Sequence, residues 1–189
     1  MTKVLVLNHH GSSLSSLLEL VRDLGASIDL AEPEALASPF PVGGYDGVIA
    51  SGGYLKSATH RETLRRYSAF FEELDSPFLG VCLGMRILGH CYGARIGKMA
   101  PVVGEHRVSL RNFPLCPGLS EFVVHQNHRY GLLPPVPSTM ENFTADTDSI
   151  QAVKVNGKEQ YAVQFHPEVG ASPARVILQN FVSRCSGKT

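Results

Sequence analysis

Short apolar runs alternate with stretches of helical periodicity over about the first hundred residues of the chain. Strands are predicted over four apolar runs: Lys3–Leu7, Ser27–Leu30, Asp46–Ala50 and Phe78–Val81. Helices are predicted where apolar residues recur every three or four positions, from Leu14 to Leu24 (with Ser12 or Ser13 as a capping residue) and over 60–74. Because the runs do not alternate with polar residues, we expect parallel strands covered on both faces. Strands that alternate with helices in this way predict βαβ units.

The pattern changes from about residue 100, where strands with short connections are predicted: Arg107–Leu110, Phe122–Val124, Ile150–Val155 and Tyr161–Phe165. Asn156-Gly157 predicts a two-residue hairpin turn between the last two. A C-terminal helix is predicted after Ser172-Pro173, with Val176, Ile177, Phe181 and Val182 facing inward. The chain is therefore predicted to be a single α/β domain over 1–189. We expect an open, mostly parallel sheet flanked by helices, with a small antiparallel β region in the C-terminal half.

Composition narrows the classes of protein that this chain can represent. Lys plus Arg and Asp plus Glu each number 17, so the formal net charge is zero, and a dedicated nucleic-acid binder is not expected. No apolar run approaches the roughly 18 residues that cross a bilayer, so no membrane span is expected. The four cysteines show no Cys-x-x-Cys spacing, and the N-terminus does not resemble an export signal. We therefore expect a cytoplasmic protein without a zinc site or another cofactor.

Cys82 stands between a predicted strand and a predicted helix, with Gly80 and Gly84 on either side. A nucleophile flanked by glycines at this junction is typical of a sharp strand-to-helix turn. Such a turn raises the side chain at the carboxyl edge of the sheet, where ligands bind in open α/β folds. The N-terminus of the following helix favours a thiolate and offers free N–H groups to an oxyanion. The sequence thus predicts a nucleophilic cysteine, with a buried core cysteine as the alternative.

His166 is predicted at the end of a strand, immediately before Pro167, and Glu168 follows two residues after the histidine. A cysteine nucleophile needs a base, and the base needs an acceptor that orients it. Cys82, His166 and Glu168 supply these three residue types, although the first two are distant in sequence. Triads are defined by geometry and role, so this distance does not argue against one.

Together, Gly80-Val81-Cys82-Leu83-Gly84 and Gln164-Phe165-His166-Pro167-Glu168 resemble the nucleophile and base motifs of the class I glutamine amidotransferases. The resemblance extends over essentially the whole chain and implies a flavodoxin-like sheet. It also implies hydrolysis of L-glutamine through a γ-glutamyl thioester, with Cys82 as nucleophile, His166 as general base and acid, and Glu168 as the orienting residue. Hydrolysis of this kind releases glutamate and ammonia.

The same resemblance implies further site residues. Two residues correspond to the family's oxyanion hole. Gly53 lies in the glycine loop after the third strand, and Leu83 directly follows the nucleophile. The substrate-binding candidates are Gly52, Met85, Arg86, Gln126, Asn127 and Tyr130, the last three acting mainly through backbone groups. His125 and His128 have no neighbours in the sequence that would complete a metal site.

The chain departs from the family pattern at two positions. Arg86 stands where the family usually has glutamine, and this arginine would either pair with a substrate carboxylate or block the pocket. Tyr54 stands where the glycine loop usually continues with proline. Neither change affects the three triad residues.

Because these residues contain no ATP-binding motif, the resemblance implies that ammonia passes to an ATP-dependent synthetase on another chain. The length, and Met85 after Cys82-Leu83-Gly84, are similar to free-standing glutaminase subunits of GMP synthetase. The segment 125–130 instead resembles small subunits of carbamoyl-phosphate synthetase, and subunits of anthranilate and aminodeoxychorismate synthases have a similar length. Two other functions remain open: a γ-glutamyl hydrolase or peptidase with the same triad, and an idle binding or regulatory domain of this fold.

Overall fold

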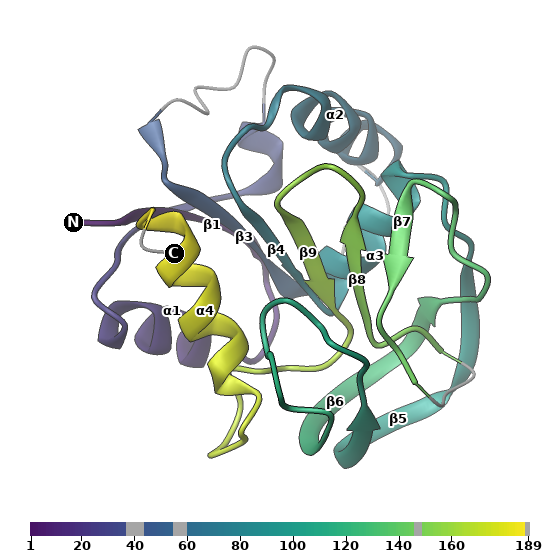
Figure 1. Cartoon of the computed structure of the whole chain (residues 1–189). Coiled ribbons are helices and arrows are strands. Elements are labelled where there is room, and N and C mark those ends of the chain that lie inside the picture. Colours follow the sequence, from purple (N-terminus) through teal and green to yellow (C-terminus); the bar gives the residue numbers. More distant parts are fainter. Residues whose placement is uncertain (37–43, 55–59, 146–148, 188–189) are drawn as a thin grey trace.

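A seven-stranded sheet forms the centre of the computed structural model, which describes residues 1–36, 44–54, 60–145 and 149–187 (Figure 1). Its strands lie in the order β2 (Ser27–Ala31), β1 (Lys3–His9), β3 (Gly47–Gly53), β4 (Phe78–Val81), β9 (Gln160–Val163), β8 (Ala152–Val155) and β7 (Met140–Asn142). The first five strands are parallel, and β8 and β7 continue the sheet in antiparallel pairing. The predicted mostly parallel sheet is confirmed, while β7 was not predicted.

Helices cover both faces of this sheet, as expected for parallel strands. The four helices are α1 (Leu14–Asp23), α2 (His60–Glu73), α3 (Leu83–Cys91) and α4 (Arg175–Cys185), with a short 3-10 helix η1 at Pro33–Ala35. Successive side chains of β1 enter different layers: Val4 and Val6 share a core with α1 and α4, whereas Leu5 and Leu7 share one with α2 and α3. Full burial of each such side chain stabilises the fold by about 2 kcal/mol.

The C-terminal half adds a separate two-stranded antiparallel sheet, β5 (Ile96–Ser109) with β6 (Glu121–Leu132). This ribbon confirms the predicted antiparallel region, but its strands are much longer than the short runs that the sequence suggested. Most residues of β5 are exposed or half-buried, so the apolar pattern that reveals a core strand is missing there. A further irregularity between Lys98 and Val102 shifts the register of the pair.

The chain leaves the main sheet before His166. The strand predicted to Phe165 is wrong at this end, because β9 stops at Val163. His166 instead forms an isolated bridge with His125 of β6, and its backbone N–H donates to the His125 carbonyl at 2.9 Å. A turn at Asn156-Gly157 does connect β8 and β9, but the connection spans four residues, 156–159, and not the predicted two. The β5–β6 ribbon is thus hydrogen-bonded to the loop that carries His166.

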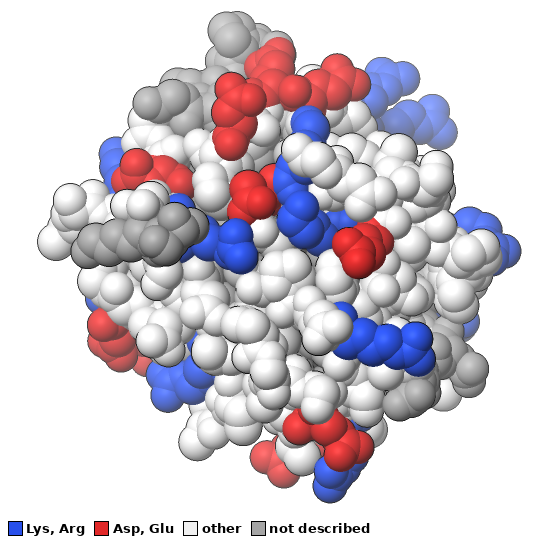
Figure 2. Space-filling view, viewed as in Figure 1, with Lys and Arg blue, Asp and Glu red and all other residues white. Residues whose placement is uncertain are grey.

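Charged side chains of both signs are interspersed on the face shown in Figure 2. Among the described residues of that face, basic side chains do not gather into a continuous strip of the kind that binds a nucleic-acid backbone. None of the described helices is long and apolar enough to span a bilayer.

Candidate active site

Cys82 occupies the junction between β4 and α3, as its flanking glycines predicted. Its backbone has φ 51° and ψ −94°, which is rare for a residue with a side chain and is found at strained functional turns. The turn is tight, since a Cβ added to Gly80 would lie 2.6 Å from the carbonyl carbon of Gly84. Leu83 is the first residue of α3, so its N–H is one of those that the helix itself leaves unused.

His166 and Glu168 form a buried pair on the loop after β9. His166 Nδ1 lies 2.7 Å from Glu168 Oε1, and their side chains are only 8% and 1% exposed. Because the carboxylate can only accept, Nδ1 carries the proton and donates it to Glu168. The other ring nitrogen, Nε2, is then the one that can exchange protons with a substrate.

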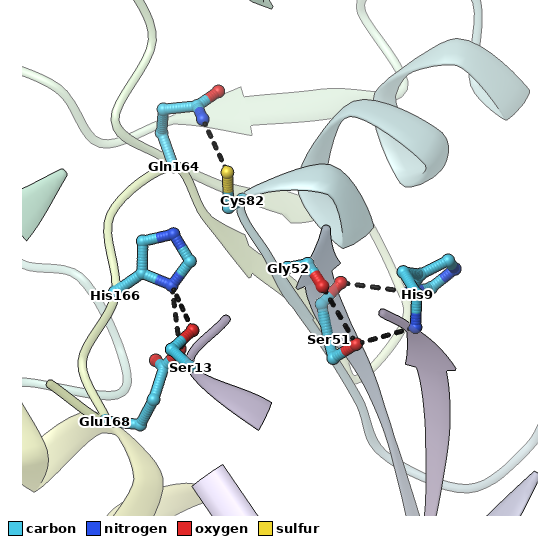
Figure 3. Close-up of polar contacts among 8 residues, drawn as sticks. All are labelled: His9, Ser13, Ser51, Gly52, Cys82, Gln164, His166 and Glu168. Carbon is cyan, nitrogen blue, oxygen red and sulfur yellow. Dashed lines mark hydrogen bonds and ion pairs between the residues drawn. The ribbon is translucent and has the colours of Figure 1, made fainter. Parts of the chain in front are cut away.

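Cys82 and His166 meet beside Gly52, although β3, β4 and the loop after β9 are distant in sequence. A Cβ built on Gly52 would lie 2.6 Å from His166 Cε1 and 3.5 Å from Cys82 Cβ, so only glycine fits between them. Figure 3 shows the imidazole between Cys82 and the carboxylate of Glu168. The predicted nucleophile, base and orienting carboxylate are therefore brought together in an order suited to acyl transfer.

The electrostatics of His166 favour the charged imidazolium. Burial opposes protonation, but the neighbouring Cys82 sulfur and the Glu168 carboxylate outweigh it and raise the pKa of His166 to about 10. A protonated His166 beside Cys82 can stabilise a thiolate and later give its proton to a leaving amine.

A pocket of 510 Å³ opens next to this centre. Its lining includes four of the predicted site residues together with mostly apolar side chains: Gly53, Leu83, Arg86 and Tyr130, with Tyr54, Leu64, Ile87, His90 and Ile96. Arg86 stands one helical turn after Cys82, and its backbone N–H donates to the Cys82 carbonyl at 3.3 Å. Its Nε is buried and has no hydrogen-bond partner, and no described carboxylate forms an ion pair with it.

Three predicted substrate-binding residues lie elsewhere. The Met85 side chain is fully buried in the core between α2, α3 and the sheet, so it cannot contact a ligand in the pocket. Gln126 is also buried, and its Oε1 pairs with His128 Nε2 at 2.7 Å. Asn127 alternates to the other face of β6 and lines a separate 210 Å³ hollow beside His166. The predicted contacts of Gln126 and Asn127 run mainly through backbone groups, so these side-chain positions do not decide them and they stay predictions.

Two polar residues at the centre escaped the sequence reasoning. Ser13 makes no side-chain cap on α1; its hydroxyl donates to Glu168 Oε1 at 2.7 Å and lies 3.1 Å from His166 Nδ1. Gln164 is fully buried, and its Nε2 donates to Cys82 Sγ at 3.5 Å. The only sequence signal that Gln164 lies at the centre was its position two residues before His166.

Within the described ranges, His, Cys, Asp and Glu side chains do not gather in groups of three or more that could hold a metal ion. The arrangement has the parts of an acyl-transfer centre: a thiol, an imidazole fixed by a carboxylate, and backbone N–H groups at a helix start.

The class of protein follows from this fold and centre. A family model described as "Glutamine amidotransferase class-I" matches residues 5–185, and the chain belongs to that family. It is 27% identical over 187 residues to a glutamine-hydrolyzing GMP synthase subunit of Thermoplasma volcanium, an alignment that covers 97% of this chain and 92% of the relative.

A second relative, the corresponding GMP synthase subunit of Haloquadratum walsbyi, is 31% identical over 202 residues, with 98% and 100% of the two chains covered. A solved structure from Thermoplasma acidophilum superposes with a TM-score of 0.88 at 26% identity, covering 99% of this chain and 95% of that one. A Thermotoga maritima glutamine amidotransferase shares the fold, with a TM-score of 0.75 at 22% identity over 94% and 80% of the chains. The predicted family and fold class are confirmed.

Proposed function

We propose that this glutamine amidotransferase hydrolyses L-glutamine at the centre formed by Cys82, His166 and Glu168, as the glutaminase subunit of a GMP synthase. The observation that carries the proposal is the meeting of Cys82 and His166 at Gly52, with His166 Nδ1 held 2.7 Å from Glu168. Two relatives that align over nearly the whole chain are named as glutamine-hydrolyzing GMP synthase subunits. These names favour a GMP synthase, over the other synthases considered, as the enzyme that uses the ammonia.

The first half of the reaction forms a thioester. Cys82 Sγ attacks the side-chain amide carbon of glutamine, and the amide oxygen becomes an oxyanion. The N–H groups of Gly53 and Leu83 stabilise that oxyanion. His166 Nε2 gives its proton to the departing nitrogen, so ammonia leaves and a γ-glutamyl thioester remains on Cys82.

Water completes the cycle. His166, now neutral, accepts a proton from the attacking water, and the C–S bond breaks to release glutamate and the Cys82 thiolate. Glu168 keeps the imidazole oriented throughout and stabilises its charge. Ser13, which donates to the same carboxylate oxygen, is a positioning residue for Glu168.

Arg86 places a positive charge in this pocket, where the family's usual glutamine would be neutral. A half-buried guanidinium without a carboxylate partner is costly unless a ligand supplies the anion. Arg86 lines the pocket one turn from the nucleophile, so it is placed to bind the α-carboxylate of the substrate. This role requires the pocket to be open, which its 510 Å³ volume supports.

The ammonia product is passed to an ATP-dependent synthetase subunit on another chain. The four cysteines are free, and thiols are kept reduced in the cytoplasm, which supports that compartment as the place of action.

The test is glutamate release from L-glutamine by the purified protein, alone and with the host's own GMP synthetase subunit and its substrates. Cys82→Ala should abolish release in both settings, and Cys91→Ala, which changes a cysteine outside the centre, should not. Equal rates for Cys82→Ala and the wild type would refute the proposal.

A further inference from the structure

Behind the glycine loop lies a second buried histidine that the mechanism above does not use. His9 ends β1, is 1% exposed, and contacts the loop 51–54 through three of its groups. Its backbone N–H donates to Ser51 Oγ at 3.0 Å, and its Nδ1 lies 3.0 Å from the Ser51 carbonyl. Its own carbonyl accepts from the Tyr54 N–H at 3.0 Å. Figure 3 shows His9 on the side of Ser51 and Gly52 opposite to Cys82 and His166.

The hydrogen-bond partners determine the tautomer of His9. The Ser51 carbonyl can only accept, so Nδ1 carries the proton. In the neutral ring Nε2 must then accept, and the Tyr67 hydroxyl of α2 lies 2.8 Å from it. Tyr67 is fully buried, and its ring stacks on that of His9 with the two ring centroids 5.9 Å apart. Tyr67, His9 and Ser51 therefore form one directed chain of hydrogen bonds that ends on the glycine loop.

The environment of His9 supports this neutral form. Burial dominates and lowers the pKa of His9 to about 4, and neighbouring His10 and Arg86 act in the same direction. The ring consequently keeps one donor and one acceptor over the whole physiological range. A charged ring would carry two donors, so the Tyr67 hydroxyl would have to accept from Nε2 instead of donating to it.

We propose that His9 and Tyr67 are positioning residues that hold the loop Ser51-Gly52-Gly53 in the geometry that stabilises the transition-state oxyanion. The proposal rests on the function proposed above, because it assigns the Gly53 N–H to that oxyanion. Neither residue touches the substrate; both act through the Ser51 carbonyl. Ser51 transmits the constraint to its neighbour, since its hydroxyl donates to the Gly52 carbonyl at 3.0 Å.

Tyr67→Phe is the first test, because it removes one oxygen and keeps the ring packing. Loss of the O–H leaves His9 Nε2 unpaired and loosens the loop, and a small displacement of a catalytic group costs about tenfold to a hundredfold in rate. We expect the kcat for glutamate release to fall at least about tenfold with little change in KM, because the oxyanion exists only in the transition state. His9→Asn, whose amide can replace the Nδ1 donor, should lose less than His9→Leu.

Tyr92→Phe is the matched control, since it removes a hydroxyl that donates to Gln160 Oε1 at the same 2.8 Å on the same side of the sheet. Alkylation of Cys82 by iodoacetamide supplies a second control: this displacement forms an S–C bond, expels iodide and creates no oxyanion. Tyr67→Phe should leave the alkylation rate at Cys82 within about twofold of the wild type while hydrolysis falls. Equal losses in both reactions, or an equal loss in Tyr92→Phe, would contradict a role in positioning.

Hydrogen exchange tests the same role without any activity. The amides of the loop 51–54 should exchange faster in Tyr67→Phe than in the wild type or in Tyr92→Phe. Unchanged exchange and unchanged kcat in Tyr67→Phe overturn the inference alone, because Cys82→Ala would still be inactive. A Cys82→Ala protein as active as the wild type overturns the proposed function instead, whatever the loop does.

Discussion

Two buried histidines stand on opposite sides of the glycine loop and show opposite electrostatics. His166 has a pKa raised to about 10, whereas His9 has a pKa lowered to about 4, from the same ordinary value of 6.5. Both are almost excluded from water, so burial does not explain the difference. The partners do: a carboxylate and a thiol beside His166, and a carbonyl and a phenol beside His9.

The proposed function makes His166 a reactive imidazole and leaves His9 an inert one, on opposite sides of the same loop. Ionic partners compensate the loss of hydration and leave a charged ring that can move protons. Neutral partners satisfy the hydrogen bonds of the two ring nitrogens but do not stabilise a charge, so the ring stays neutral and fixed in position. Substitutions on the reactive side should therefore cost more activity than substitutions on the inert side.

The largest effect is expected for His166→Asn. Loss of the imidazole removes the proton donor for ammonia and the base for water, and triad members removed singly cost about a thousandfold or more. Glutaminase kcat should fall by about that factor, whereas His9→Asn should cost only about tenfold. Similar losses for the two variants would remove the distinction between the histidines.

Glu168→Gln should follow, with a loss of about a hundredfold or more in kcat. The neutral amide no longer stabilises the imidazolium, so the pKa of His166 should fall. Imidazole NMR titration measures this directly: the wild-type ring should stay protonated until the pH approaches about 10, and the variant ring should lose its proton at lower pH. An unchanged titration in Glu168→Gln would show that the carboxylate does not control the ring.

Ser13→Ala removes one of the two donors to Glu168 Oε1 and leaves the His166 contact. We expect a loss of about tenfold in kcat, the lower end of the cost of one hydrogen bond to a charged group. Ser12→Ala is the matched control. A Ser13→Ala rate equal to that of Ser12→Ala would argue against positioning by Ser13.

Stability against pH is a separate readout that does not depend on activity, and the two histidines should act at opposite ends. The raised pKa of His166 adds stability that is complete below 6.5 and is lost as the pH rises through about 10. The lowered pKa of His9 makes stability fall as the pH drops from 6.5 towards 4, because only the unfolded chain takes up the proton there. Denaturant unfolding should therefore show a weaker acid dependence in His9→Asn and a weaker alkaline dependence in His166→Asn.

The sequence predicted the grouping of Cys82 with His166 and Glu168 because the signals for each half of the centre are local. Gly80 and Gly84 flank Cys82 within one turn, and Glu168 follows His166 by two residues, so each half of the centre can be seen in a short window. The mostly parallel sheet was equally visible, since both-sided burial leaves continuous apolar runs.

The contact between His9 and Tyr67 and the full length of the β5–β6 ribbon could not be predicted from short sequence windows. His9 and Tyr67 are 58 residues apart, and Tyr67 sits on the apolar face of α2, where its pattern indicates core packing alone. The ribbon β5–β6 depends on pairing between distant strands whose residues are mostly exposed, so periodicity gave only fragments of it. Ser12 or Ser13 was predicted only as a helix cap. The bond from Ser13 to Glu168 spans 155 positions, so no short sequence window reveals it.

The most direct test of the central claim is covalent labelling of the wild-type protein by a diazo-ketone analogue of glutamine, followed by peptide mapping. We predict one equivalent of label on Cys82, protection by excess L-glutamine, and loss of the label in His166→Asn. Label on Cys91, Cys116 or Cys185 without label on Cys82, or labelling of Cys82 that glutamine does not slow, would contradict it.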